Sequence, residues 1–362
     1  MAIQIQLQST NYNGQLANIT YYPCSGGTIS LGYQTIPYTY TNDNYEGTYD
    51  LFFSAFNQTC QLVISCPTPT QTMTPTSTVT PTPTITPTPT LTPSSSPVPA
   101  LLLNQYPGAS QAFSLRKLNN TYTGNIIEVR RSSDNATQNI GFSGDVLDSA
   151  SLLAFVGGSN GFVKTWYGQD GNNINATQIT NANQPMIVSG GTIITQNNKP
   201  TILFDGSTSY LSFNGTNLAN TKYSTFQVHS RASSIAQNYF IGGTTQATNQ
   251  NLIIGYGSNA QYLYAQYNND LPATIASFTG STLELFNCFN ISTGKSVYKS
   301  NVLIGSNINT TDLISFTGAQ IGRFITNFYY LGNVSELILY PTDQLSNRTA
   351  INTNINNYYT LY

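Results

Sequence analysis

Residues 67–99 form a tract in which threonine occupies every even position from Thr68 to Thr92 and proline recurs on the odd ones. Proline fixes the backbone angle φ and lacks an amide donor, so neither an α-helix nor a central β-strand can run through this tract. The remaining conformation is an extended, polyproline-II-like stalk, which at about 3.1 Å per residue reaches about 100 Å. The sequence therefore predicts two folded parts, residues 1–66 and 101–362, separated by a stalk over 67–100.

The stalk also carries an apolar residue at every sixth position. Polyproline II has three residues per turn, so positions six apart share an edge. Such an edge favours a bundle of parallel chains, and we expect homotrimers held by the stalk; a simple repeat without a packing role is the alternative. The residues on this predicted oligomerisation edge are Met73, Val79, Ile85 and Leu91.

Composition favours an all-β protein of near-neutral charge. The chain has 12 Lys and Arg against 14 Asp and Glu, and 25 tyrosines. Few charges with many aromatic and β-branched residues are typical of β-sheets. The near-neutral balance argues against nucleic-acid binding, and no apolar stretch approaches 18 residues, which argues against membrane insertion. Surfaces rich in Tyr, Asn, Ser and Gly suit sugars, although β-sandwiches share this composition.

The four cysteines and the single histidine give no metal motif. No CxxC spacing occurs, so we predict neither a metal site nor a cofactor. Cys60 and Cys66 lie at the two ends of one predicted strand, about 20 Å apart, and cannot pair with each other. A disulfide between Cys24 and either of them, a link between chains through Cys66, and free thiols remain open.

Residues 1–66 read as about six short strands separated by turns such as Asn13-Gly14. We expect a small β-sandwich that anchors the molecule to other virion proteins. Met1–Gln8 alternates apolar and polar residues, like a strand and unlike a signal peptide. A stalked protein without an export signal is expected to leave a cell by lysis, as virion parts do.

Residues 101–362 have the length of one large β-sandwich. Helices are predicted at 109–118, at 148–156 with Asp148 as N-cap, and from an N-cap at Ser346 through Ile351, Ile355 and Tyr358. Trp166 is expected in the core. The predicted strands are 126–130, 162–167, 201–204, 210–213, 225–230, 252–255, 261–266, 282–289, 296–299 and 333–340.

Two runs carry a family resemblance. Lys199–Gly206 with Tyr210-Leu211, and Gly332–Tyr340 before the last helix, resemble concanavalin A-like, laminin-G-type jelly rolls, which are often found in phage and viral fibre proteins. Parts of 109–178, including Glu128–Asp134 and Thr165–Gly171, are similar to the catalytic domain of fungal arabinofuranosidase B, itself such a jelly roll. The resemblance implies a jelly roll over 101–362 and, more narrowly, a glycosidase.

The carboxyl groups argue against that enzymatic implication. A retaining glycosidase needs two carboxyl groups about 5–5.5 Å apart. Glu128 is expected to pair with Arg130 on its strand, and Asp205 to sit in a hairpin turn. Gly168 stands where the arabinofuranosidase pattern has aspartate, and the family's adjacent cysteines are absent. No nucleophile motif is evident, so we predict no catalytic residue and no enzyme.

The candidate ligand-binding residues lie on two strands. Tyr262, Tyr264 and Gln266 alternate toward one side of a strand and form the predicted sugar-stacking surface, with an oligomer contact as the alternative. His229 faces opposite Phe226 and Val228 and is expected on a solvated face.

We therefore predict a virion surface fibre of a tailed phage whose jelly roll binds host-surface carbohydrate through several weak sites acting together. The alternatives are a secreted carbohydrate-active enzyme of arabinofuranosidase type and a purely structural capsid decoration protein.

Overall fold

The computed structural model describes residues 101–362 apart from residue 269, and the backbones of six strands between residues 3 and 64. The chain divides into two units, Met1–Leu91 and Thr92–Tyr362. In the first unit, β1 pairs with β4, and the other four strands form an antiparallel sheet in the order β3-β2-β5-β6. These strands are β1 Ile3–Leu7, β2 Leu16–Pro23, β3 Ile29–Thr35, β4 Tyr38–Asn42, β5 Gly47–Phe53 and β6 Gln58–Ile64.

Several predictions fall on the part of the chain that lies outside the described residues. They are the stalk at 67–100 with Met73, Val79, Ile85 and Leu91, the cysteines Cys24 and Cys66, and the side chain of Cys60. The homotrimer, the disulfide and the anchoring role of residues 1–66 stay predictions. Cys288 is described, and its thiol is free and buried.

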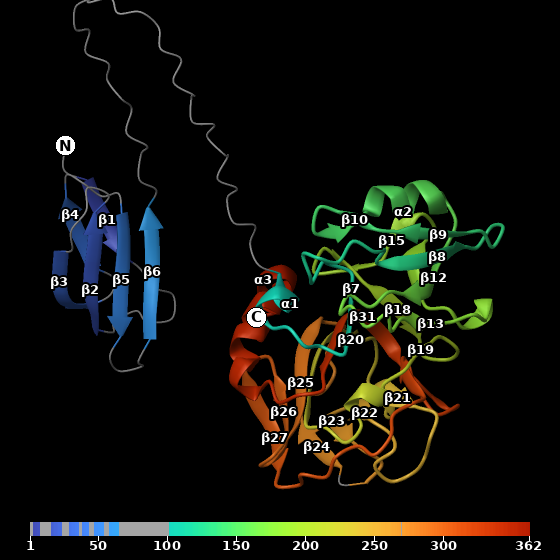
Figure 1. Cartoon of the computed structure of the whole chain (residues 1–362). Coiled ribbons are helices and arrows are strands. Elements are labelled where there is room, and N and C mark those ends of the chain that lie inside the picture. Colours follow the sequence, from blue (N-terminus) through green and yellow to red (C-terminus); the bar gives the residue numbers. More distant parts are fainter. Residues whose placement is uncertain are drawn as a thin grey trace, which may run out of the picture. The chain divides into compact units, whose positions relative to one another are not determined.

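The regular secondary structure described in the second unit consists mainly of antiparallel strands, which confirms the all-β class (Figure 1). Its centre is β20 (Tyr223–Arg231), which pairs with β25 (Glu284–Ile291) on one side and β31 (Leu331–Tyr340) on the other. β26 (Gly294–Lys299) and β27 (Val302–Asn307) extend this layer beyond β25. All nine residues of β20 are buried, as befits a strand covered on both faces.

A second layer faces β20 and β25 across the core. It is a meander of β21 (Asn238–Gly243), β22 (Ile253–Ser258), β23 (Gln261–Ala265) and β24 (Leu271–Thr274). Aromatic rings from the two layers meet directly. The imidazole of His229 on β20 stacks on Phe240 of β21 with 4.6 Å between ring centroids, and Tyr262 of β23 stacks on Phe286 of β25 at 3.9 Å.

Shorter strands complete the unit. The apolar core extends among these strands through Phe113 and Trp166, whose ring centroids are 5.9 Å apart. Trp166 is fully buried, which confirms the prediction that it lies in the core. The shorter strands are β7 Gln111–Ser114, β8 Ile127–Arg131, β9 Thr137–Ile140, β10 Phe142–Ser143, β11 Val146–Leu147, β12 Gly161–Trp166, β13 Ala176–Thr177, β14 Met186–Ser189, β15 Thr192–Ile193, β16 Thr195–Gln196, β17 Lys199–Pro200, β18 Ile202–Asp205, β19 Leu211–Phe213, β28 Ala319–Ile321, β29 Arg323–Phe324 and β30 Phe328–Tyr329.

Two of the three predicted helices exist. α2 (Ser149–Val156) begins after Asp148, whose Oδ1 accepts a 3.0 Å hydrogen bond from the amide of Ser151, so the N-cap prediction is confirmed. It ends at Gly157, where φ is 60°, a value that favours glycine. The helix predicted over 109–118 is wrong, because residues 111–114 form β7 and pair with Leu339–Glu336 of β31.

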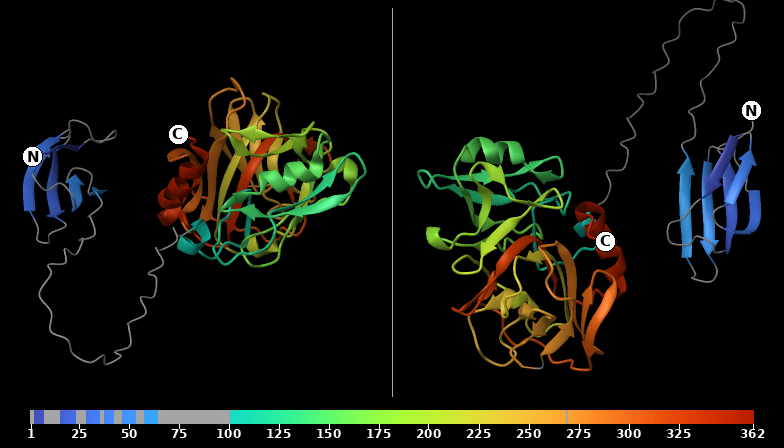
Figure 2. Two further views of the ribbon diagram at one scale, coloured as in Figure 1. Left: turned by 90° about the horizontal axis from the view of Figure 1, so that it is seen from above. Right: turned by 180° about the vertical axis from the view of Figure 1, so that it is seen from behind.

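The third predicted helix is α3 (Arg348–Tyr359), and it covers the outer face of the β20 layer. Its N-cap position is Asn347, the last residue of the short 3-10 turn η3 (Leu345–Asn347) and one residue after the predicted cap Ser346. Ile351, Ile355 and Tyr359 pack with Phe226 and Leu285 in a second apolar cluster. Figure 2 shows α3 in red beside the orange strands from both directions. The remaining helices are α1 (Leu102–Gln105), η1 (Asn181–Asn183) and η2 (Thr216–Leu218).

Within the described ranges, no helix combines the length and apolar character that a membrane crossing requires.

Candidate functional site

The four predicted ligand-binding residues lie in the interior. Tyr262, Tyr264, Gln266 and His229 are all 0% exposed, so the prediction of an exposed sugar-stacking surface is wrong. Tyr262 and Tyr264 do share one side of β23, but that side faces the core. Their hydroxyl groups are satisfied there by other buried polar groups.

His229 is the centre of this internal network. Its Nδ1 lies 2.8 Å from the hydroxyl of Tyr330, and its Nε2 lies 2.9 Å from the hydroxyl of Tyr262. A neutral imidazole suits both contacts, since one nitrogen donates and the other accepts. Burial lowers the pKa of His229 to about 3, so the ring stays uncharged at neutral pH. His229 is therefore a structural residue of the core.

Tyr264 and Gln266 belong to a neighbouring network. The Tyr264 hydroxyl donates to the hydroxyl of Tyr223 at 2.7 Å, and the amide of Gln266 donates to the same oxygen at 2.9 Å. The ammonium of Lys295 donates to Oε1 of Gln266 at 2.5 Å. These contacts bind β23 to β20 and β26, which explains why side chains typical of recognition surfaces are buried here.

Among the described residues, the structure shows neither a cluster of metal ligands nor a reactive thiol. No three His, Cys, Asp or Glu side chains of those residues lie close enough to hold a metal ion together. Burial raises the pKa of the Cys288 thiol to about 12, which keeps it protonated and unreactive.

Most carboxylates of the second unit have structural partners. Glu336 is buried and accepts two hydrogen bonds from the guanidinium of Arg116, at 2.8 and 3.0 Å. Asp205 accepts from the amides of residues 207–209 in its turn, as predicted. Glu128 forms an ion pair with Lys164 at 2.9 Å, so the prediction that Glu128 pairs with Arg130 is wrong. Arg130 instead donates to Oε1 of Gln184 at 2.7 Å.

Asp170 is different, because it lines an open cavity. The cavity has a volume of about 450 Å³, within the range of about 300–1,000 Å³ that small-molecule sites occupy. It is assembled from the loop before β7, the loop after β12, η2 and the end of β31. Its lining consists of Gly108, Ala109, Ser110, Asp170, Asn172, Asn217 and Pro341.

Two backbone amides hold the Asp170 carboxylate in place. Oδ2 accepts from the amide of Ala112 at 3.1 Å, and Oδ1 accepts from the amide of Asn172 at 2.8 Å. Asn172 is fixed in turn, since its side-chain amide donates to the carbonyl of Ser110 at 3.1 Å. Burial raises the pKa of Asp170 above its ordinary value despite these donors. A rigid, half-buried carboxyl group with a raised pKa is suited to donating a proton.

Glu284, the first residue of β25, lines a second cavity. Its Oε1 lies 2.5 Å from Nζ of Lys299, and its Oε2 accepts a 3.2 Å hydrogen bond from the hydroxyl of Tyr256. Arg231 and Phe278 close the cavity, which measures about 160 Å³. That volume is below the usual range for a small-molecule site. Of the two cavities, the one at Asp170 is the better candidate for a functional site.

Sequence reasoning did not single out Asp170. The available signal was its position in Thr165–Gly171, where an acidic residue precedes Gly171 in a turn after a strand.

Part of this chain is similar to a known protein family. A family model described as the catalytic domain of α-L-arabinofuranosidase B matches residues 105–279, slightly less than half of the chain. Asp170 lies inside the matched range and Glu284 lies outside it. No curated protein matches this chain.

Solved arabinofuranosidases have a similar fold. One is a GH54 α-L-arabinofuranosidase soaked with a cyclic sulfate inhibitor, with a TM-score of 0.52 at 15% identity. Another is an arabinofuranosidase complexed with arabinofuranosyl-α-1,2-xylobiose, with a TM-score of 0.53 at 16% identity. Each match covers 68% of this chain and 62% of the other, so this chain spans less than two thirds of their length. At these identities, the similarity shows a shared fold.

These findings overturn the functional prediction. A non-enzymatic virion surface fibre is wrong, because the family match and the fold neighbours point to a glycoside hydrolase. The structural decoration protein and the virion surface location depended on the same interpretation and are wrong for the same reason. The predicted partners, which are other virion proteins, host-surface carbohydrate and further copies of the chain, are tested by none of these observations.

Proposed function

We propose that residues 101–362 form a glycoside hydrolase of the arabinofuranosidase type that removes α-L-arabinofuranosyl groups. The observation that carries the proposal is the family match over 105–279. The two facing β-layers support it, and we infer that they form a jelly-roll sandwich of the concanavalin A-like kind. The ligand of one fold neighbour, arabinofuranosyl-α-1,2-xylobiose, suggests an arabinose side group on a xylan-like chain as the substrate class.

We assign the proton donor of this reaction to Asp170. Its carboxyl group would protonate the glycosidic oxygen as the bond from the anomeric carbon to that oxygen breaks. Two backbone amides fix its position, and burial raises its pKa, so a protonated fraction is available nearer to neutral pH. Among the described residues that line this cavity, Asp170 is the one carboxyl group. The assignment is therefore limited to the acid step.

Hydrolysis of 4-nitrophenyl α-L-arabinofuranoside, the compound soaked into another fold neighbour, tests the proposal. The full chain should release 4-nitrophenol from this compound. With the less activated arabinofuranosyl-α-1,2-xylobiose, Asp170→Asn should reduce kcat by about 100- to 10,000-fold, the usual contribution of a general acid. The matched control is Asp145→Asn, an exposed carboxylate outside both cavities, which should leave activity unchanged.

Three outcomes separate the parts of the proposal. No release by the unaltered chain refutes the hydrolase. Undiminished hydrolysis of arabinofuranosyl-α-1,2-xylobiose by Asp170→Asn refutes only the role of Asp170 as proton donor. Loss of activity in Glu284→Gln, with Asp170→Asn active, moves the site to the cavity at Glu284.

A further inference from the structure

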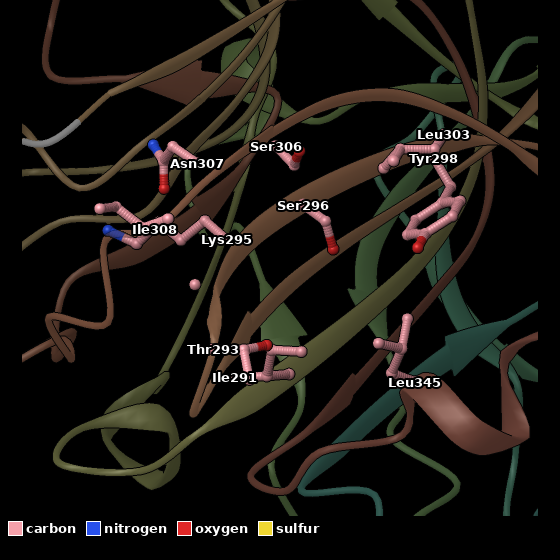
Figure 3. Close-up of a pocket in the computed structure, with 11 residues that line it drawn as sticks. Ile291, Thr293, Lys295, Ser296, Tyr298, Leu303, Ser306, Asn307, Ile308 and Leu345 are labelled. Carbon is pink, nitrogen blue, oxygen red and sulfur yellow. The ribbon is translucent and has the colours of Figure 1, made fainter.

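A third cavity lies on the outer side of β26 and β27. Figure 3 shows its lining, which comes from these two strands, the end of β25, the turn before β26, Ile308 after β27 and Leu345 of η3. The cavity has a volume of about 410 Å³, in the range of small-molecule sites. It shares no lining residue with the cavity at Asp170.

A buried hydroxyl group without a partner lies in the wall of this cavity. Ser296 is 8% exposed, and its Oγ has no hydrogen-bond partner among the described residues. In Figure 3 its oxygen points into the space enclosed by the lining residues. An unpaired buried polar atom costs about 1–3 kcal/mol, so a ligand that pairs with it gains from the contact.

Apart from Lys295, the other polar groups of the lining are uncharged. Ser296 on β26 is paired in register with Ser306 on β27, and Thr293 lies at the turn between β25 and β26. The one cationic lining residue is Lys295, whose ammonium is turned away and donates to the interior Gln266. A ligand here meets hydroxyl and amide groups without a compensating charge. This favours a neutral, polyhydroxylated molecule over a phosphate or an ammonium compound.

Tyr298 contributes its hydroxyl group to the cavity. Its ring is already occupied, since the guanidinium of Arg348 lies 4.1 Å from its centroid and Phe289 packs against it edge-on at 5.8 Å. The apolar surface comes from Leu303 and Ile308, which are 49% and 91% exposed. Hydroxyl groups beside exposed apolar carbon match the two kinds of surface that a sugar ring presents.

We propose that this cavity, the β26–β27 groove, binds a neutral sugar unit as a site separate from the cavity at Asp170. The proposal goes beyond the hydrolase and does not depend on it, because binding here involves no carboxylate. Two sites on one unit would let a polysaccharide chain be held while another part of it is cleaved.

Titration of the full-length Asp170→Asn chain with L-arabinose and with xylobiose, followed by ligand-observed NMR, tests the groove. Ser296→Ala should weaken binding in the groove about two- to tenfold, the value of one hydrogen bond. Ser306→Phe should abolish this binding, because Ser306 is exposed and a phenyl ring fills the groove. Thr274→Phe, on an exposed position of β24, is the matched control and should bind as the parent does.

The outcomes differ from those of the hydrolase test. Loss of sugar binding in Ser306→Phe, with binding retained in Thr274→Phe, supports the groove whether or not the unaltered chain hydrolyses a substrate. Equal binding by Ser306→Phe and Thr274→Phe overturns the proposal, as does the absence of any sugar binding. A change of oligomeric state in Ser306→Phe with unchanged sugar binding assigns the groove to a contact between copies and also overturns it.

Discussion

The buried imidazole of His229 predicts a specific dependence of stability on pH. Burial lowers its pKa from 6.5 to about 3 in the folded state, whereas the unfolded chain has a pKa near 6.5. Below pH 6.5 the unfolded state therefore binds a proton that the folded state does not. Its free energy falls relative to the folded state, and stability is lost as the pH decreases from about 7 toward 3.

The magnitude follows from the size of this shift. At pH 7.5 the unfolded imidazole is mostly neutral, and the effect is close to zero. A solution pH of 5 is about 1.5 units below the pKa of the unfolded imidazole. At about 1.36 kcal/mol per unit, the free energy of unfolding is therefore lower by about 2 kcal/mol than at pH 7.5. Ordinary carboxylates titrate near pH 4, so between pH 7.5 and 5 the histidine is the main contributor.

Urea unfolding at pH 7.5 and 5.0 measures this change. Trp166 is the single tryptophan and lies fully buried in the same apolar cluster as the rings around His229, so its fluorescence reports unfolding of the second unit. His229→Gln removes the titrating group and should be less stable at pH 7.5, but its stability should change by less than about 0.5 kcal/mol between the two pH values.

A direct measurement covers the case in which His229→Gln does not fold. The chain has one histidine, so its imidazole NMR resonance needs no assignment. That resonance should stay constant from pH 7.5 down to about 4, because the folded pKa lies near 3. A resonance that titrates with a midpoint near 6.5 refutes the burial argument. Equal pH dependence in His229→Gln and the unaltered chain refutes it as well.

Two further substitutions test the contacts that hold the second unit together. Arg116→Met leaves the buried carboxylate of Glu336 without its bidentate partner and should lower the free energy of unfolding by about 3–5 kcal/mol, with a loss under 1 kcal/mol contradicting this. Asp148→Ala removes the side chain that caps α2 and should lower it by about 1 kcal/mol, whereas Asp148→Asn, which can still cap, should restore most of the loss. Both are measured by urea unfolding with Trp166 fluorescence.

The fold was predictable where local patterns agree with long-range pairing. Asp148 precedes an apolar helical run and caps α2, and Leu152 and Val156 of this helix are buried in the core, so local and long-range signals agree. The alternation of side chains over 261–266 correctly predicted a strand there and placed Tyr262 and Tyr264 on the same face of it. The helix expected over 109–118 failed because Gln111–Ser114 pairs with β31, more than 200 residues later, and this pairing outweighs local propensity.

The sequence did not show whether the polar face of a strand points to solvent or to the core. On β20 every position is buried, so the alternation that should place His229 in solvent has no solvated face to match. The hydroxyl groups that satisfy its imidazole come from Tyr262 and Tyr330, 33 and 101 residues away. Only the assembled fold brings them together. Asp170 escaped notice for the same reason, because its cavity is built from four separate segments of the chain.

The tyrosine-rich composition has two explanations, and the structure favours one of them for much of this unit. Tyr223, Tyr256, Tyr262, Tyr264, Tyr330, Tyr340 and Tyr359 are fully buried, so much of the tyrosine content supplies core volume and internal hydrogen bonds. We therefore expect ligand recognition from groups that line a cavity and have no strong partner inside the protein. Ser296 satisfies this condition outright, and Asp170, held by the backbone amides of Ala112 and Asn172, satisfies it in part. In a chain with so few charges, a cavity carboxylate free of any Lys or Arg partner is the feature most expected to perform chemistry.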